Sequence, residues 1–306
     1  MNTFTSRLYA DEIDLARLIE FLSVARPADR VSDYPSATDL REMLCQPELQ
    51  ANTRLWFDQQ NRLIAFALVD AYNNFLFDYP PHANSLELEE AIMQWGVTCV
   101  PHASRENAEE VTLDAVCRED DVERYAWLLR HGFQPQAMRT LRFVRLLADP
   151  LLDPQLPTGF SIRSVAGLAE VDALVALHRA AFGTDRMTVE ERRAMMSVPD
   201  YDPKLDLVAV APAGRLAGFC VCSIPVEENA VTGRNEGYTD PIGVHPDFQQ
   251  KGLARALLMT GLQLLRERGV EYAVLGTSSE NTAMQAAAHA AGFQVESSKV
   301  WWAKPV

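Results

Sequence analysis

Three proton-exchanging side chains alternate along one extended stretch of this 306-residue chain: Glu236, Tyr238 and Asp240. Side chains two residues apart on a strand share a face, so all three can line one reaction site. Glu236 and Asp240 are candidate general bases, because a carboxylate can take the proton that an attacking nucleophile must lose. The alternative interpretation is a pair of strand-edge carboxylates that only contact water.

A glycine-containing turn follows, between the apolar segment 241–244 and a helix that opens at Leu253. The start of a helix leaves backbone amides unpaired, and such amides bind phosphate groups, especially beside a basic side chain. An ordinary glycine in a strand-to-helix turn is the alternative. The candidate ligand-binding residues of the turn and helix start are Gln249, Gln250, Lys251, Gly252, Leu253, Ala254 and Arg255.

The helix itself is indicated by spacing. One face at helical period carries Leu253, Leu257, Leu258, Gly261, Leu264 and Leu265. Arg266 and Arg268 occupy the last turn, where cations meet the negative end of the helix dipole, and Gly269 is a typical C-terminal cap.

The spacing Gln249-x-x-Gly252-x-Ala254, after Val244-His245-Pro246, resembles the signature of the GCN5-related N-acetyltransferase (GNAT) family. The resemblance covers residues 160–306 well and residues 1–147 only by the order of elements. It implies an enzyme that uses acetyl-CoA as acyl donor and acetylates a primary amine of a small-molecule or peptide acceptor.

The same resemblance implies roles for individual residues. Backbone groups of Ile242 and Val244, on either side of Gly243, would pair with the pantetheine arm. The amide of Ile242 or of its neighbour would face the thioester oxygen. Amides from Gln250 through Arg255 would hold the pyrophosphate. Asn281 would bond the arm, although a helix N-cap is the alternative role for it.

One departure from the family pattern concerns the group that protonates the sulfur. Members commonly place a tyrosine five residues before the phenylalanine of a Gly-Phe pair, and here that position is Ala288. Water, Ser278, Tyr238 or His289 would have to replace it. The missing hydroxyl also leaves open a different class of function, a non-catalytic acyl-CoA-binding or regulatory protein.

The order of predicted elements occurs twice, which favours a tandem of two related domains. The proline-rich segment LADPLLDPQLPTG breaks both helical and strand periods. We therefore predict a degenerate GNAT-like domain over 1–148, a linker over 149–159 and a catalytic domain over 160–306. The predicted fold class is α/β (α+β), each domain having a mixed, mainly antiparallel central sheet flanked by helices.

Elements are predicted in the same order in both halves. In the first, strands are expected near 6–9, 54–57, 63–71, 110–116 and 143–147, and helices at 13–22, 38–44, 86–96 and 121–131. In the second, strands are expected at 160–163, 207–211, 216–224, 241–244, 272–276 and from 293, and helices at 168–182, 189–196, 253–268 and 282–291.

The first copy lacks the features of the ligand-binding turn. With Val244 placed on Asp78, Gly252 falls on Leu86, and Glu87, Glu89 and Glu90 crowd the same helix start. Carboxylates there would repel a phosphate ligand. We expect this copy not to bind CoA, and to act as a structural domain that also walls the acceptor site.

The composition of the chain limits the classes of binding partner that we expect. The net charge is −14 and the first half contains no lysine, which argues against nucleic acid and anionic membranes as partners. The five cysteines form no CxxC motif, and the first residues lack the apolar core of a signal peptide. We expect a cytoplasmic monomer or homodimer with reduced thiols, without a metal and without a membrane span.

Overall fold

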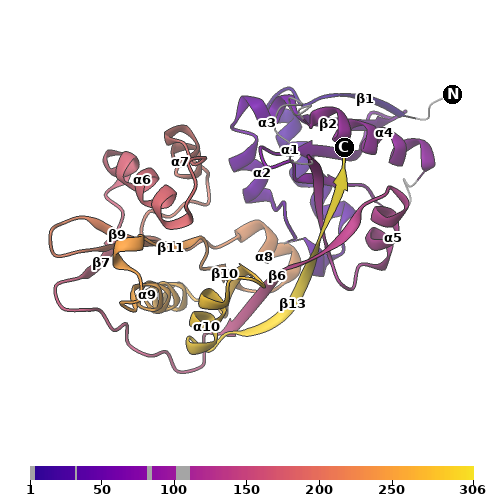
Figure 1. Ribbon diagram of the computed structural model, residues 1–306. Helices are drawn as coiled ribbons and strands as arrows, with labels where there is room; N and C mark the ends of the chain where they lie inside the picture. The colour runs from indigo at the N-terminus through magenta and orange to yellow at the C-terminus, as the bar shows by residue number, and fades with distance from the viewer. Residues whose placement is uncertain (1–3, 32, 81–84, 101–110) are drawn as a thin grey trace. The chain divides into compact units, whose positions relative to one another are not determined.

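A computed structural model describes residues 4–31, 33–80, 85–100 and 111–306. The chain forms two compact units, one of residues 1–140 with 298–306 and one of residues 141–297 (Figure 1). The boundary between them falls inside a strand, ahead of segment 149–159 where the sequence predicts a linker. The last nine residues, predicted as part of the second domain, are grouped with the first unit.

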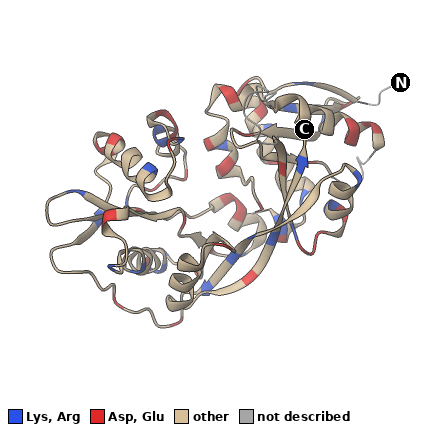
Figure 2. Ribbon diagram, in the orientation of Figure 1, with Lys and Arg blue, Asp and Glu red and all other residues tan. Residues whose placement is uncertain are grey.

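The first unit begins with an antiparallel sheet in the order β1-β2-β3-β4. Several of the helices of this unit carry acidic segments, drawn red in Figure 2. The elements are β1 (Phe4–Leu8), α1 (Glu12–Ala25), η1 (Ala28–Arg30), α2 (Ala37–Met43), α3 (Pro47–Ala51), β2 (Thr53–Asp58), β3 (Leu63–Val69), β4 (Phe75–Asp78), α4 (Leu86–Cys99), β5 (Thr112–Arg118) and α5 (Val122–Arg130).

Strands β4 and β5 of this unit touch only at their beginnings. An isolated parallel bridge joins Asn74 to Asp114, and the two strands then enter different sheets. The free side of β5 is completed by the end of β13 (Gln294–Pro305), which pairs with it from Lys299 to Pro305. Trp302 of that segment is fully buried, with its ring 4.4 Å from the ring of Tyr125.

The second unit repeats this plan. An antiparallel sheet has the order β11-β9-β8-β7, and β12 is bonded to β10 and to β6. The elements are β6 (Gln134–Leu146), β7 (Ser161–Ser164), η3 (Gly167–Glu170), α6 (Val171–Phe182), α7 (Val189–Met195), β8 (Asp206–Val210), β9 (Leu216–Val221), α8 (Val226–Thr232), β10 (Glu236–Tyr238), β11 (Ile242–Val244), η4 (Pro246–Phe248), α9 (Leu253–Glu267), β12 (Tyr272–Ser278) and α10 (Thr282–Ala290).

The segment from β10 to β11 passes from one sheet to the other. β10 runs parallel to β12, whereas β11 runs antiparallel to β9. The last backbone hydrogen bond from this segment to β12 comes from Thr239, whose amide and hydroxyl both donate to Val274 O, at 3.0 and 3.1 Å. Beyond that point β11 pairs with β9, in a different sheet from β12, just as β4 and β5 lie in different sheets in the first unit.

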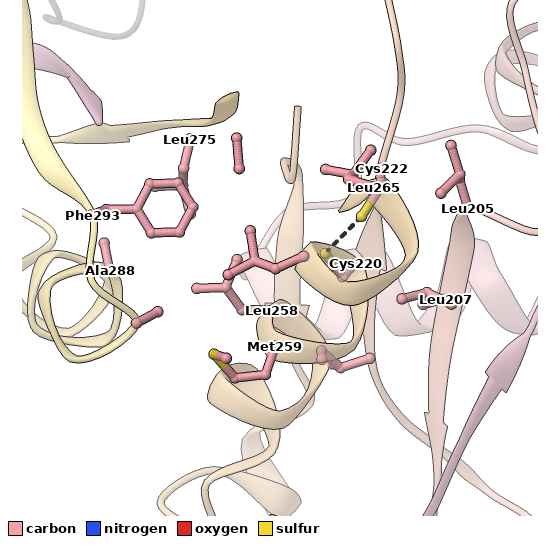
Figure 3. Packing of buried hydrophobic residues seen from close by; sticks show 14 of the residues in the cluster. Leu205, Leu207, Cys220, Cys222, Leu258, Met259, Leu265, Leu275, Ala288 and Phe293 are labelled. Carbon is pink, nitrogen blue, oxygen red and sulfur yellow. Dashed lines mark hydrogen bonds between the residues drawn. The ribbon is translucent and has the colours of Figure 1, made fainter. Parts of the chain in front are cut away.

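Helix α9 anchors the second unit through its apolar face. Leu257, Leu258, Leu262 and Leu265 are fully buried against β8, β9 and β12 (Figure 3). Gly261 allows the closest approach, since a Cβ there would lie 2.6 Å from Cys222 Sγ. The predicted inward face is confirmed at Leu253, Leu257, Leu258, Gly261 and Leu265, whereas Leu264 is only partly buried. All five cysteines are free thiols.

Several local predictions differ from the structure. Helix α2 begins at Ala37, one residue before the predicted start, with Ser36 as N-cap in a capping box with Asp39. Strand β6 begins at Gln134 rather than near Phe143. Three short elements were not predicted: α3, β4 and α8. Within the described residues, no helix is long and apolar enough to span a membrane.

Candidate functional site

The turn before α9 has a backbone conformation that exposes its amides. Gln250 (φ 59°) and Gly252 (φ 79°) both have positive φ, a region that glycine enters without strain. Gly252 is the N-cap, so no side chain is available to accept the first helical N–H groups. The first turn of α9 also contains no acidic residue. The amides at this helix start are therefore open to an anion.

Basic side chains flank these amides. Lys251 and Arg255 are both exposed, and neither forms an ion pair with any other residue that the structure describes. Arginines elsewhere in the unit are mostly paired, for example Arg192 with Asp206 and Arg268 with Asp202. Positive charge and the positive end of the helix dipole thus act together at this turn.

The backbone of β11 offers a free edge next to the turn. Val221 donates to Pro241 O at 3.0 Å and His245 donates to Ala217 O at 2.9 Å. Because antiparallel bonding alternates, Gly243 is bonded to β9 while the N–H and C=O groups of Ile242 and Val244 point away from it. These groups lie on the outer edge of β11, which is the end strand of its sheet.

Gly243 has a packing role that the sequence did not reveal. A Cβ at this position would lie 2.7 Å from Phe219 Cε1 and 2.9 Å from Ala181 Cβ. Only glycine lets α6 and the Phe219 ring pack this closely on β11.

Glu236 is one of four charged side chains that form a closed ring of ion pairs. Glu236 contacts Arg142 (2.7 Å) and Arg234 (2.6 Å), and Glu296 contacts the same two arginines at 2.8 and 2.7 Å. Asn229 also bonds the Glu236 backbone on both its N–H and its C=O. Glu236 is 3% exposed, and both guanidinium groups engage its carboxylate.

Tyr238 lies on the same face, as predicted from the alternation. Its hydroxyl is 3.4 Å from Arg142 Nη1. Burial raises the pKa of Tyr238 to about 12, although Arg142 acts in the opposite direction. The phenol therefore keeps its proton at neutral pH and is able to donate it.

Asp240 sits apart from the ring, just beyond the end of β10. Its Oδ2 accepts the amide N–H of Gly276 at 3.0 Å, across the point where β11 and β12 separate. Of the two predicted bases, Asp240 bonds the backbone of β12 and Glu236 lies within the ion-pair ring.

The remaining sequence candidates have identifiable local roles. Asn281 caps α10, its side chain accepting the amide of Met284 at 3.0 Å. His245 accepts the amide of Asp247 and so serves the turn. The side-chain Nε2 of Gln249 donates to Val244 O at 3.4 Å. The His289 ring lies edge-on to Phe143.

Ala288, at the position where the family has a tyrosine, is fully buried and packs in the core beside Phe293 (Figure 3). A tyrosine at position 288 would have to fit its phenol ring into this packed core.

The corresponding helix start in the first unit is closed. Ser85 caps α4 by accepting the amide of Leu88 at 3.2 Å. Glu87 and Glu90 are exposed there, as predicted. Glu89 is not: it turns inward, 2% exposed, and bonds Arg130 and the Tyr79 hydroxyl at 3.1 and 3.2 Å. Two carboxylates, not three, face solvent at this end.

Residues of the ion-pair ring other than Glu236 were not singled out from the sequence. Arg142, Arg234 and Glu296 are too far apart in the chain for any local pattern to connect them. Within the described residues, no group of three or more His, Cys, Asp or Glu is arranged to hold a metal.

The acetyltransferase (GNAT) family model matches residues 171–293. The mycothiol acetyltransferase of Propionibacterium freudenreichii subsp. shermanii is 36% identical over 160 residues, 51% of this chain and 50% of that protein. The match to this relative thus spans about half of its length.

Solved structures resemble the whole chain. A GCN5-related N-acetyltransferase from Sphaerobacter thermophilus has a TM-score of 0.70 at 20% identity, covering 100% of this chain and 96% of that one. A tandem GNAT protein from the clavulanic acid biosynthesis pathway has a TM-score of 0.66 at 17% identity, covering 99% and 98%. At these identities the likeness shows the fold, and it confirms the predicted tandem architecture.

Proposed function

Residues 171–293 form a domain of the GNAT acetyltransferase family, and from that premise we propose that the second unit transfers an acetyl group from acetyl-CoA to a primary amine of a small-molecule or peptide acceptor. The observation that carries this proposal is the uncapped start of α9. It combines open amides after Gly252, the exposed cations Lys251 and Arg255, and the free backbone edge of Ile242 and Val244.

In this proposal the phosphates of the coenzyme bind at the turn from Gln249 to Arg255 and its pantetheine arm pairs with β11. The amine nitrogen attacks the thioester carbonyl carbon. A carbon–nitrogen bond forms, the carbon–sulfur bond breaks, the nitrogen loses one proton and the sulfur gains one. The backbone amide of Ile242 stabilises the negative charge that develops on the carbonyl oxygen.

Asp240 is the preferred base of the two carboxylates, since Glu236 is committed to two arginines. The proposed donor to the sulfur is Tyr238, whose phenol is protonated at neutral pH. Asp240→Asn should lower kcat about 100-fold, as is usual for loss of a general base, with acetyl-CoA affinity retained. The loss should shrink as pH approaches the pKa of the amine, where neutral amine becomes abundant.

The test is a pH–rate profile of Asp240→Asn beside Glu236→Gln. Glu236→Gln leaves part of the ion-pair ring unmatched, so it should lower the free energy of unfolding by roughly 1–3 kcal/mol more than it changes the shape of the profile. A parental profile for Asp240→Asn would exclude Asp240 as the base. If the pH–rate profile of Glu236→Gln loses one of its limbs, Glu236 is the general base instead.

A direct assay can identify the amine that accepts the acetyl group. Because relatives are named mycothiol acetyltransferases, the amine whose acetylation yields mycothiol is the first acceptor to test, within a panel of amino-acid, polyamine and peptide amines. Release of CoA thiol is the readout. Acceptor-dependent release supports the proposed reaction.

A second class of function is favoured by one observation, the buried Ala288 in place of the family tyrosine. A non-catalytic acyl-CoA-binding protein would bind acetyl-CoA with the same turn but release no thiol with any acceptor. Coenzyme binding without turnover across the panel would favour this second function.

A further inference from the structure

The ion-pair ring of the second unit also contacts the residue proposed above as proton donor to the sulfur. The ring consists of Arg142, Arg234, Glu236 and Glu296, which come from β6, β10, β13 and the segment just before β10 (Figure 1). Its two arginines and two glutamates pair with one another, so the ring has no net charge. The additional contact joins Arg142 to Tyr238.

Each guanidinium nitrogen of Arg142 bonds a different residue. Nε donates to Glu296 at 2.8 Å, and Nη2 donates to Glu236 at 2.7 Å. Nη1 donates to the Tyr238 hydroxyl at 3.4 Å. The two short bonds to carboxylates fix the plane of the guanidinium, and with it the direction from which Nη1 approaches the phenol.

The bond from Arg142 leaves the proton of the phenol available. A guanidinium has donors only, so the Tyr238 oxygen accepts from Nη1 and its own O–H points toward another group. Among the residues that the structure describes, the Tyr238 hydroxyl has no second hydrogen-bond partner. Its proton can therefore be given to a ligand atom.

The same bond favours the loss of that proton. Burial raises the pKa of Tyr238 to about 12, and the charge and hydrogen bond of Arg142 act against this rise. At 3.4 Å the bond is long for an N–H···O contact, but such bonds become shorter and stronger when the acceptor is ionised. An interaction that strengthens as the reaction proceeds lowers the barrier.

We propose that Arg142 is a positioning residue for acetyl transfer, which orients the Tyr238 hydroxyl and stabilises the phenolate that forms when Tyr238 protonates the departing sulfur. The O–H bond of Tyr238 breaks, an S–H bond forms on the coenzyme, and the phenolate then regains a proton from water. This inference rests on the proposed acetyl transfer and on Tyr238 as its proton donor.

The first experiment asks whether Arg142 acts through Tyr238. Arg142→Lys keeps the positive charge of the ring but loses the planar donor geometry. It should lower kcat about fivefold or more, with the Kd of acetyl-CoA unchanged. In the Tyr238→Phe background the same substitution should change kcat by less than about twofold, because no hydroxyl remains to be positioned. An equal loss in both backgrounds, or a parental kcat in Tyr238→Phe, would overturn the proposal.

Arg234→Lys is the matched control. Arg234 contacts the same two glutamates, at 2.6 and 2.7 Å, but its guanidinium lies over the Tyr272 ring. Its effect on kcat should be the same with and without the Tyr238 hydroxyl. If circular dichroism shows that Arg142→Lys is unfolded, the double variant Arg142→Gln with Glu296→Gln replaces it, because that pair of changes removes one charge of each sign.

A measurement without turnover separates this inference from the proposed function. In protein isotopically labelled at tyrosine Cζ, the Tyr238 NMR signal is the one missing from Tyr238→Phe. It should shift in Arg142→Lys and stay in place in Arg234→Lys. If the parent releases no thiol with any amine, the acetyl transfer itself is refuted, whereas a shifted signal still supports the Arg142–Tyr238 contact. Turnover in the parent with an unshifted signal in Arg142→Lys would refute the positioning role alone.

Discussion

At the residue scale, the positive φ of Gly252 sets what the proposed coenzyme turn tolerates. A Cβ at this position would meet no neighbouring atom within 4 Å. Any effect of a substitution on ligand binding therefore comes from backbone strain or from what the new side chain does at the helix start, and not from a clash within the protein.

Gly252→Glu should weaken acetyl-CoA binding at least tenfold, about 1.4 kcal/mol, because a carboxylate would stand beside the phosphates. Gly183→Glu is the control for backbone strain: Gly183 also has positive φ (64°) and open space around its Cα, but it ends α6. Calorimetric titration compares the two. If the two variants bind acetyl-CoA with equal affinity, the coenzyme does not bind at this turn.

Ala288 gives a second prediction at this scale. Ala288→Tyr should lower the free energy of unfolding by about 1–3 kcal/mol, the usual cost of overpacking a core. Ala286→Tyr, at an exposed position on the same helix, should be close to neutral. Chemical denaturation measures both, and an activity gain in a stable Ala288→Tyr protein would contradict the buried placement.

At the element scale, regular helices and their inward faces were predictable from sequence, and the partners of strands were not. The leucine spacing of α9 fixes its buried face locally. Strand β6 was predicted too short because Gln134–Thr140 shows no alternation, and β4 is only four residues long. The ion-pair ring unites residues 142, 234, 236 and 296, so its existence depends on tertiary structure alone.

The ring also makes stability depend on pH. Burial acts to raise the pKa of Glu296, but hydrogen bonds from Arg234 and Arg142 outweigh it and hold the pKa below its ordinary value. The folded protein thus binds this proton less readily than the unfolded chain. The resulting stabilisation is present above the unfolded-state pKa and is lost as pH falls through the lowered folded-state pKa.

Glu296→Gln should therefore be destabilised relative to the parent at pH 7, and the difference should narrow as the solution is acidified below about pH 4. Unfolding by urea at a series of pH values provides the measurement. Glu227→Gln, in the first turn of α8, is the control for removing a carboxylate outside the ring. A pH-independent difference between Glu296→Gln and the parent would show that Glu296 contributes no charge interaction.

At the scale of the whole molecule, the two units have the same plan, but the N-terminus of α4 is capped and acidic whereas that of α9 is uncapped and basic. Ser85 and two exposed glutamates close α4, whereas Gly252 and two exposed cations open α9. Calorimetry with acetyl-CoA should accordingly give one site per chain. Gly252→Glu should reduce binding at that site without revealing a second one, and two equivalent sites in the parent would contradict the predicted loss of coenzyme binding in the first unit.

The grouping of residues 298–306 with the first unit has a consequence for biosynthesis. Residues 141–297 must leave the ribosome before that strand exists. At about 5–20 residues per second, the nascent first unit waits roughly 8–30 s. Throughout that interval β5 lacks the strand that pairs with it from Lys299 onward, and Trp302 is not yet there to fill its place in the core. An unpaired sheet edge of this kind is a template for pairing with another chain. The N-terminal half, although translated first, is therefore completed last.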